Sequence, residues 1–104
     1  MPEIVWKRGA EEDLLGIFAK QEDFRTGFGE SFTLKLDAVL ENLRNHPGLA
    51  PVFEPPMRRL VVGNTGYGVF YTIEHRGIII HAIIHLSQHP QGIRAKIRRL
   101  LGLE

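Results

Sequence analysis

The chain has 104 residues, 43% of them apolar and 24% charged, with a formal net charge of +1, which is typical of one folded domain (residues 1–104) with a single hydrophobic core. The absence of cysteine excludes a disulfide framework, a thiolate nucleophile and a Cys-based zinc site. No apolar run reaches the about 18 residues that span a membrane, and none near the N-terminus has signal-peptide length, so we expect a cytoplasmic protein without a membrane partner.

The N-terminal part predicts one strand and two helices. The apolar run within Pro2–Lys7 is typical of an edge strand, and apolar positions at helical spacing predict a first helix from Ala10 to about Lys20. A turn is expected within Gln21–Gly29. A strongly amphipathic second helix then runs from Phe32 to Leu43 and stops at His46-Pro47-Gly48. Two helices joined so closely are expected to form an antiparallel hairpin that packs on a sheet.

The remainder predicts three strands and a short helix. Leu49–Pro56 contains three prolines and is expected to be an extended connection. Met57–Val62 is a predicted strand, followed by a hairpin turn over Gly63–Gly66. The strands Tyr67–His75 and Ile78–Leu86 form a second hairpin, and Ile93–Leu101 a short C-terminal helix. The fold class is therefore α+β, in the order β-α-α-β-β-β followed by a short C-terminal helix.

Strict alternation along Ile78–Leu86 would divide its side chains between two faces of the sheet. The first face is apolar and needs a cover of helices; it carries Ile78, Ile80, Ala82, Ile84 and Leu86. The second is expected to be partly open; it carries Ile79, His81, Ile83 and His85.

Histidines offer no clear metal site. His81 and His85 share a face but are about 13 Å apart, at roughly 3.3 Å per residue, which is too far to bind one ion together. His85 and His89 converge only if the chain turns at Ser87-Gln88. We favour His81 packing beside the core and His85 fixing the strand end by hydrogen bonding, with no metal and no cofactor.

The second half of the chain is basic. After Pro56 it contains seven Lys and Arg residues against two acids, and such a surface is suited to nucleic acid or to an acidic protein. Together with Tyr71 and His85, these cations also suit general acid–base cleavage of RNA. Arg58 and Arg59 project to opposite faces of their strand, so only one can join such a surface. A solvated rim of arginines explains the charges equally well.

Several short motifs occur in the order found in toxins of the RelE/ParE superfamily, which bacterial toxin–antitoxin modules encode. They are Trp6 in the first strand, Asp13-Leu14 in the first helix, His46-Pro47-Gly48 after the second, Arg58–Leu60, Tyr67–Tyr71, and Ala82–His85 with the following Pro90. The chain resembles this superfamily over nearly all its length. The resemblance implies a helical hairpin packed on a small, mainly antiparallel sheet. It also implies a neutralising ParD- or RelB-like antitoxin whose tail folds onto the toxin with acidic residues over the basic half.

Members of the superfamily divide into ParE-like inhibitors of DNA gyrase and RelE-like, ribosome-dependent mRNA endonucleases, so the fold leaves the activity open. An arginine frequent in the ribonucleases is Gly68 here, a basic residue after the AIIH-like segment is Gln88, and no tyrosine follows in the C-terminal helix. Losing several such groups together would remove most of the catalysis. We therefore favour a ParE-like toxin that poisons gyrase.

Two alternatives stay open, a RelE-like ribonuclease and an inactive member that only binds a partner. The candidate catalytic residues of a ribonuclease would be Arg59, His85, His89 and Arg98. The candidate partner-binding residues under the ParE reading are Arg58, Arg59, Tyr71, Arg94, Lys96, Arg98 and Arg99.

Overall fold

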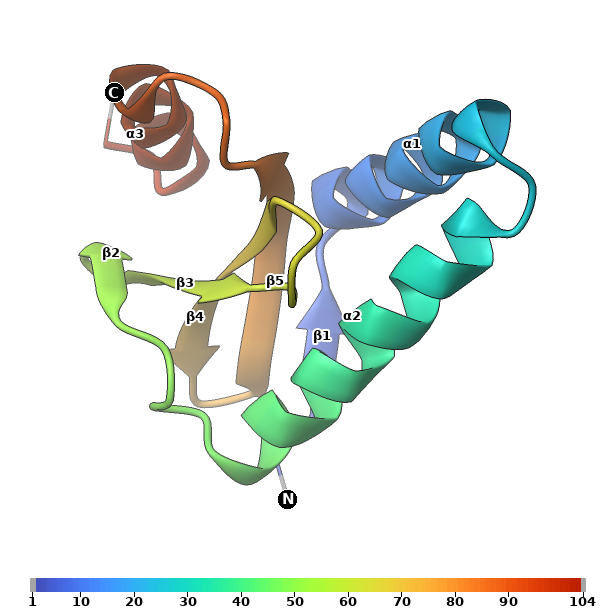
Figure 1. Cartoon of the computed structure of the whole chain (residues 1–104). Helices are drawn as coiled ribbons and strands as arrows, with labels where there is room; N and C mark the ends of the chain where they lie inside the picture. The colour runs from blue at the N-terminus through green and yellow to red at the C-terminus, as the bar shows by residue number, and fades with distance from the viewer. Residues whose placement is uncertain (1, 104) are drawn as a thin grey trace.

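The computed structural model describes residues 2–103, which form a mixed five-stranded sheet and three helices (Figure 1). The elements are β1 (Ile4–Trp6), α1 (Arg8–Phe24), α2 (Phe28–Asn45), β2 (Val52–Glu54), β3 (Met57–Val61), β4 (Tyr67–Glu74), β5 (Gly77–His85) and α3 (Pro90–Leu100). The strand order is β1-β5-β4-β3-β2; β1 pairs with β5 in parallel and all other pairs are antiparallel. The predicted α+β class and element order are confirmed, with β2 as an additional strand inside the predicted extended connection.

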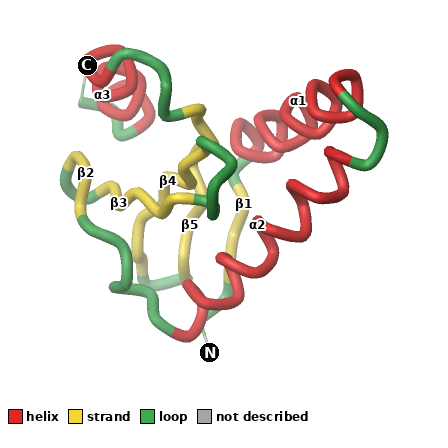
Figure 2. The backbone as a smooth tube through the Cα atoms, in the orientation of Figure 1, coloured by secondary structure: helices red, strands yellow, loops and turns green. Residues whose placement is uncertain are grey.

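The two long helices form the predicted antiparallel hairpin, and the sheet lies between this hairpin and α3 (Figure 2). Gly27, at φ 92°, precedes α2 and has no side chain to cap it. The carboxylate of Glu22 takes this role, because it accepts hydrogen bonds from the backbone N–H groups of Gly27 at 3.0 Å and Gly29 at 2.8 Å. The turn between the helices is therefore shorter than the predicted segment Gln21–Gly29. Both helices extend further toward it than their apolar spacing predicts.

Each face of the sheet carries its own core. The hairpin buries α2 residues spaced for one helix face against the larger cluster of the sheet: Phe32, Leu36, Leu40 and Leu43. On the opposite face, a smaller cluster lies between the sheet and α3: Met57, Phe70, Ala82, Ile84, Ile93 and Ile97. Both faces are therefore covered, whereas the sequence predicted a partly open second face.

The strict alternation predicted for β5 is wrong because the strand contains a β-bulge. Phe70 of β4 pairs with Ala82 and Tyr71 pairs with Ile80, which leaves His81 as an extra residue. The bulge reverses the alternation beyond it, so Ile80 and then Ile83 pack in the hairpin cluster, while Ala82 packs in the α3 cluster. No sequence signal marks this position.

Candidate partner-binding surface

Basic side chains of α3 meet an aromatic residue of β2 at the far edge of the sheet. The guanidinium of Arg94 lies 4.6 Å and that of Arg59 5.2 Å from the centre of the Phe53 ring, which itself packs edge-on against Phe70 at 5.5 Å. Cation–π contact holds both arginines in place without neutralising them. We call this region the α3 surface; its basic members are Arg59, Arg94, Lys96, Arg98 and Arg99.

Glu54 joins α3 to β2. Its carboxylate binds the guanidinium of Arg94 at 2.6 Å and that of Arg98 at 3.1 Å. The hydrogen bond from Arg94, with a further one from Arg98, lowers the pKa of Glu54, so the carboxylate stays charged. Within residues 2–103, Lys96 and Arg99 form no such ion pair. The α3 surface therefore combines two tethered arginines with cations that remain available to an acidic partner.

Two of the candidate partner-binding residues lie away from the α3 surface. Arg58 donates a hydrogen bond to the carbonyl oxygen of Ala50 at 2.7 Å, on the opposite face of the sheet from Arg59, as strand parity predicted. Tyr71 is fully buried, and its hydroxyl donates to the carbonyl oxygen of Pro47 at 2.8 Å. Burial raises the pKa of Tyr71. Both side chains fasten the loop between α2 and β2, and neither belongs to the basic surface.

Two of the candidate catalytic residues are histidines at the ends of secondary-structure elements. His85 is the last residue of β5, and His89 directly precedes α3. The Nδ1 atom of His85 lies 2.6 Å from Ser87 Oγ and accepts the backbone N–H of Ser87 at 3.1 Å. The ring also packs edge-on against Tyr67 at 4.7 Å. His89 is the N-cap of α3, and its Nδ1 accepts the backbone N–H of Gln91 at 3.1 Å. The predicted role of His85 at the strand end is confirmed.

His81 belongs to a buried hydrogen-bonded chain. Its Nε2 atom lies 2.9 Å from the hydroxyl of Thr72, which donates to Glu74 at 2.7 Å. Thr72 has only one proton to donate, so its oxygen accepts the hydrogen bond from the Nε2–H group of His81. Burial, and next the charge of Lys7, lower the pKa of His81. The predicted packing of His81 beside the core is confirmed. Within residues 2–103, His, Asp and Glu side chains form no group of three that could hold a metal ion.

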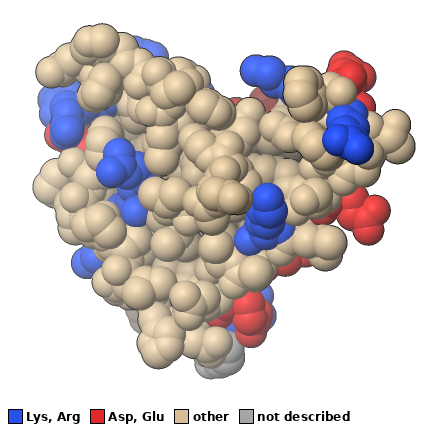
Figure 3. Space-filling model, in the orientation of Figure 1, with Lys and Arg blue, Asp and Glu red and all other residues tan. Residues whose placement is uncertain are grey.

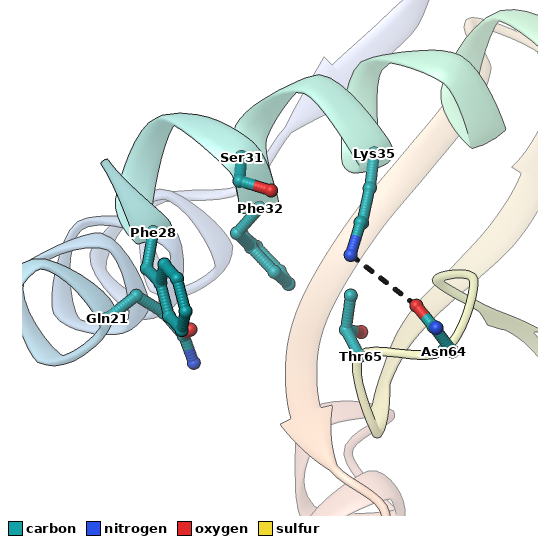
Figure 4. A pocket seen from close by; sticks show the side chains of 7 residues that line it. All are labelled: Gln21, Phe28, Ser31, Phe32, Lys35, Asn64 and Thr65. Carbon is teal, nitrogen blue, oxygen red and sulfur yellow. Dashed lines mark hydrogen bonds between the residues drawn. The ribbon is translucent and has the colours of Figure 1, made fainter. Parts of the chain in front are cut away.

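A hollow of about 370 Å³ lies between the helical hairpin and the β3–β4 turn (Figure 4). Lys35 reaches from α2 toward this turn, where its Nζ atom lies 3.4 Å from Asn64 Oδ1. The rings of Phe28 and Phe32 line the side of the hairpin. No sequence pattern marks this hollow, because its lining residues come from three separate segments.

A family model described as the ParE toxin of the type II toxin–antitoxin system parDE matches residues 4–90. The chain belongs to the ParE toxin family. The match ends at Pro90, where α3 begins, so most of the α3 surface lies beyond it. A comparison with curated proteins finds no significant match.

This membership makes the protein the toxin component of a type II toxin–antitoxin system, and it implies a cognate ParD antitoxin as partner. The suspected resemblance is thus confirmed at the level of the family. Among residues 2–103 of the toxin, no helix has both the length and the hydropathy required to cross a bilayer.

Proposed function

We propose that this toxin inhibits DNA gyrase by binding it, without chemistry of its own, and that its ParD antitoxin silences it. The observation that carries the proposal is the packing around Gly68, the position at which related ribonucleases frequently have an arginine. A Cβ atom at Gly68 would lie 3.0 Å from Leu86 Cδ2 and 3.4 Å from Arg59 Cγ. Leu86 therefore covers the place from which such an arginine would reach a phosphate.

The contacts of the four candidate catalytic residues also favour a toxin that acts by binding rather than by cleaving RNA. Arg59 stacks on Phe53, Arg98 pairs with Glu54, and the Nδ1 atoms of His85 and His89 accept backbone hydrogen bonds. A general base needs a free lone pair within reach of the proton that it removes. In the neutral form with the proton on Nε2, neither histidine has one. These contacts favour structural roles for all four side chains.

For the binding site on the target we propose the α3 surface. Lys96 and Arg99 add positive charge beside Arg94 and Arg98, and the helix is amphipathic, with Ile93 and Ile97 buried beneath it. A partly exposed basic helix face favours binding to an acidic protein surface and fast association at low salt. Arg58 and Tyr71, which face the opposite core, are not included in this proposal.

The test is controlled expression of the toxin alone in a bacterial host, with pulse labelling of DNA and protein synthesis during the first minutes. We expect DNA synthesis to stop first, and purified toxin to inhibit DNA supercoiling by purified gyrase. If protein synthesis stops first and transcripts are cut at ribosomes, the ribonuclease reading replaces this proposal. If neither process stops, the toxin is an inactive member that only binds a partner.

A matched pair of variants sharpens the test. The substitution His85→Ala removes a candidate catalytic group that lies outside the α3 surface, and we expect it to leave gyrase inhibition within about threefold of the wild type, since this residue would do no chemistry. Lys96→Glu with Arg99→Glu replaces two of the five cations of the α3 surface by acids and is expected to weaken inhibition by about tenfold or more. The opposite pattern would contradict the proposal.

A further inference from the structure

The hollow between the helical hairpin and the β3–β4 turn (Figure 4) combines aromatic walls with a charged rim, and we call it the Lys35 hollow. Its volume of about 370 Å³ lies in the range of small-molecule sites. The side chains that line it come from the end of α1, the first turns of α2 and the β3–β4 turn. A ligand in this position therefore contacts three separate segments at once.

Two phenylalanine rings form the apolar part of the Lys35 hollow. Phe32 is 3% exposed, and its ring packs edge-on against Tyr67 with 5.3 Å between the ring centres, so it is fixed by the core. Phe28 lies one turn earlier on α2. Its ring centre is 5.7 Å from that of Phe24, and the guanidinium of Arg25 lies 5.6 Å from it. Both rings are thus held in place by the protein itself, and they offer a flat ligand a preformed apolar surface.

Lys35 makes the Lys35 hollow positive. Its Nζ atom lies at the rim, 3.4 Å from the neutral acceptor Asn64 Oδ1 (Figure 4). Within residues 2–103, Lys35 forms no ion pair, and no Asp or Glu lines the hollow. In the view of Figure 3, most acidic side chains on the side of the helical hairpin lie toward its outer edge. An anion in the hollow therefore gains a charge-assisted hydrogen bond from Lys35 and breaks no ion pair.

Further hydrogen-bond donors border the hollow. In the part of the chain that the structure describes, residues 2–103, the side chains of Gln21 and Ser31 and the Nδ2 group of Asn64 form no hydrogen bond. The β3–β4 turn is itself fixed by the hydroxyl of Thr65, which donates to the carbonyl oxygen of Val62 at 2.7 Å. Amide and hydroxyl donors on a fixed frame can orient a carboxylate beside a lysine.

The start of α2 indicates a ligand with a single negative charge. The first backbone N–H groups of a helix commonly bind phosphate, but here the carboxylate of Glu22 already accepts those of Gly27 and Gly29. The helix terminus therefore adds little to anion binding, and Lys35 is the cation that lines the hollow. One ammonium group balances a carboxylate, whereas a phosphate monoester carries nearly two charges at neutral pH. A carboxylate attached to an aromatic ring matches both the charge and the walls.

We propose that the Lys35 hollow binds a small aromatic carboxylate. The carboxylate accepts hydrogen bonds from Lys35 and Asn64, and the ring lies against Phe28 and Phe32. Such a ligand bridges the helical hairpin and the β3–β4 turn, and because it binds the folded toxin alone, it raises the stability of the fold. The proposal depends neither on gyrase nor on the antitoxin, since every contact comes from the toxin and none from the α3 surface.

The test titrates the purified, full-length toxin with cinnamate and follows its backbone amides by NMR. We expect saturable binding with a Kd of about 1 mM or tighter. The changes in chemical shift should gather at residues 27–35 and 63–66, which border the hollow. Cinnamamide, which has the same shape without the charge, should bind about tenfold more weakly or worse. Shift changes that gather on α3, or no saturation up to about 10 mM cinnamate, would overturn the proposal.

A matched pair of lysine variants tests the charge. Lys35→Met removes the ammonium group but keeps an unbranched side chain, and it should weaken cinnamate binding about tenfold or more. Lys20→Met makes the same change at an exposed position of α1 outside the hollow and should bind like the wild type. Both variants are first checked for a wild-type circular dichroism spectrum. Saturating cinnamate should then raise the melting temperature of Lys20→Met but not that of Lys35→Met. Equal affinities of the two variants, or of cinnamate and cinnamamide, would overturn the proposal.

Discussion

The carboxylate of Asp13 accepts a hydrogen bond from the backbone N–H of Ile83 at 3.0 Å, although the two residues are 70 positions apart. β1 ends at Trp6, and its ladder with β5 closes where Lys7 N–H donates to the carbonyl of Ile80. Beyond that point β5 would have an open edge. Asp13, on the first turns of α1, covers it, so one carboxylate both docks α1 and completes the sheet edge.

Removing this carboxylate should destabilise the fold. Asp13→Ala leaves the N–H of the buried Ile83 without an acceptor, and we expect a loss of about 1–3 kcal/mol in the free energy of unfolding. Asp13→Asn retains an acceptor oxygen and should cost less. Urea denaturation measures both, with the exposed Glu12→Ala as a control expected within about 0.5 kcal/mol of the wild type. Equal stability of Asp13→Ala and the control would contradict this role.

Gly77, at the start of β5, admits no side chain. Its φ is 131°, and a Cβ atom there would overlap the carbonyl oxygen of Glu3, which accepts from the N–H of Ile78. Gly77→Ala should therefore cost more than about 2 kcal/mol and weaken the β1–β5 pair. Gly48→Ala, where a Cβ meets nothing within 4 Å, is the matched control. Similar melting temperatures for the two variants would refute this expectation.

The buried His81 predicts a pH dependence of stability. Its pKa in the folded toxin lies below the usual 6.5, because burial disfavours the imidazolium and Lys7 repels it. Between the two values the unfolded chain binds more protons, so the free energy of unfolding falls as pH drops from 6.5 through the lowered pKa. The slope for one proton is at most about 1.4 kcal/mol per pH unit.

His81→Gln should flatten this interval of the stability curve, measured by urea denaturation at a series of pH values. His75→Gln changes an exposed histidine in the adjoining turn and should leave the slope as in the wild type. Glu74, whose pKa is lowered first by its hydrogen bond from Thr72, contributes stability that is lost at more acidic pH. A slope that survives in His81→Gln would exclude this histidine as its source.

Glu54 should control how firmly α3 is attached. Glu54→Gln weakens the contacts to Arg94 and Arg98, which join α3 to β2. We expect faster hydrogen exchange of α3 amides with little change in the α1–α2 hairpin, since Phe53 still contacts Arg94. Glu41→Gln disrupts the Glu41–Arg44 ion pair, which lies within α2 at 3.7 Å and joins no other element, and serves as the control. Unchanged exchange in α3 would show that the apolar contacts alone hold the helix.

Local patterns predicted most of the fold. Helical spacing of Phe32, Leu36, Leu40 and Leu43 located α2, and the β-branched run of β5 identified the central strand. The start of α2 was missed because Glu22 caps it from the end of α1, a contact that leaves no apolar period. β2 was missed because it is short and surrounded by prolines, and it pairs only once β3 is in place.

The sites were less predictable. Strand parity correctly separated Arg58 from Arg59, but no local signal places Tyr71 under the α2–β2 loop or Glu54 between two arginines some 40 residues away. The edge position of β1 likewise depends on its parallel pairing with β5, the last strand in chain order. These long-range contacts depend on the topology of the fold. In a single sequence, only the resemblance to a known family indicates that topology.

The parallel pairing of β1 with β5 also determines when the sheet can form during synthesis. The ribosome makes Ile4–Trp6 first, yet their partners Ile78–Ile80 emerge only after three-quarters of the toxin has been translated. Until then the nascent chain cannot form the complete sheet. A toxin molecule truncated before Ile78 therefore lacks the strand with which β1 pairs, and its sheet cannot close.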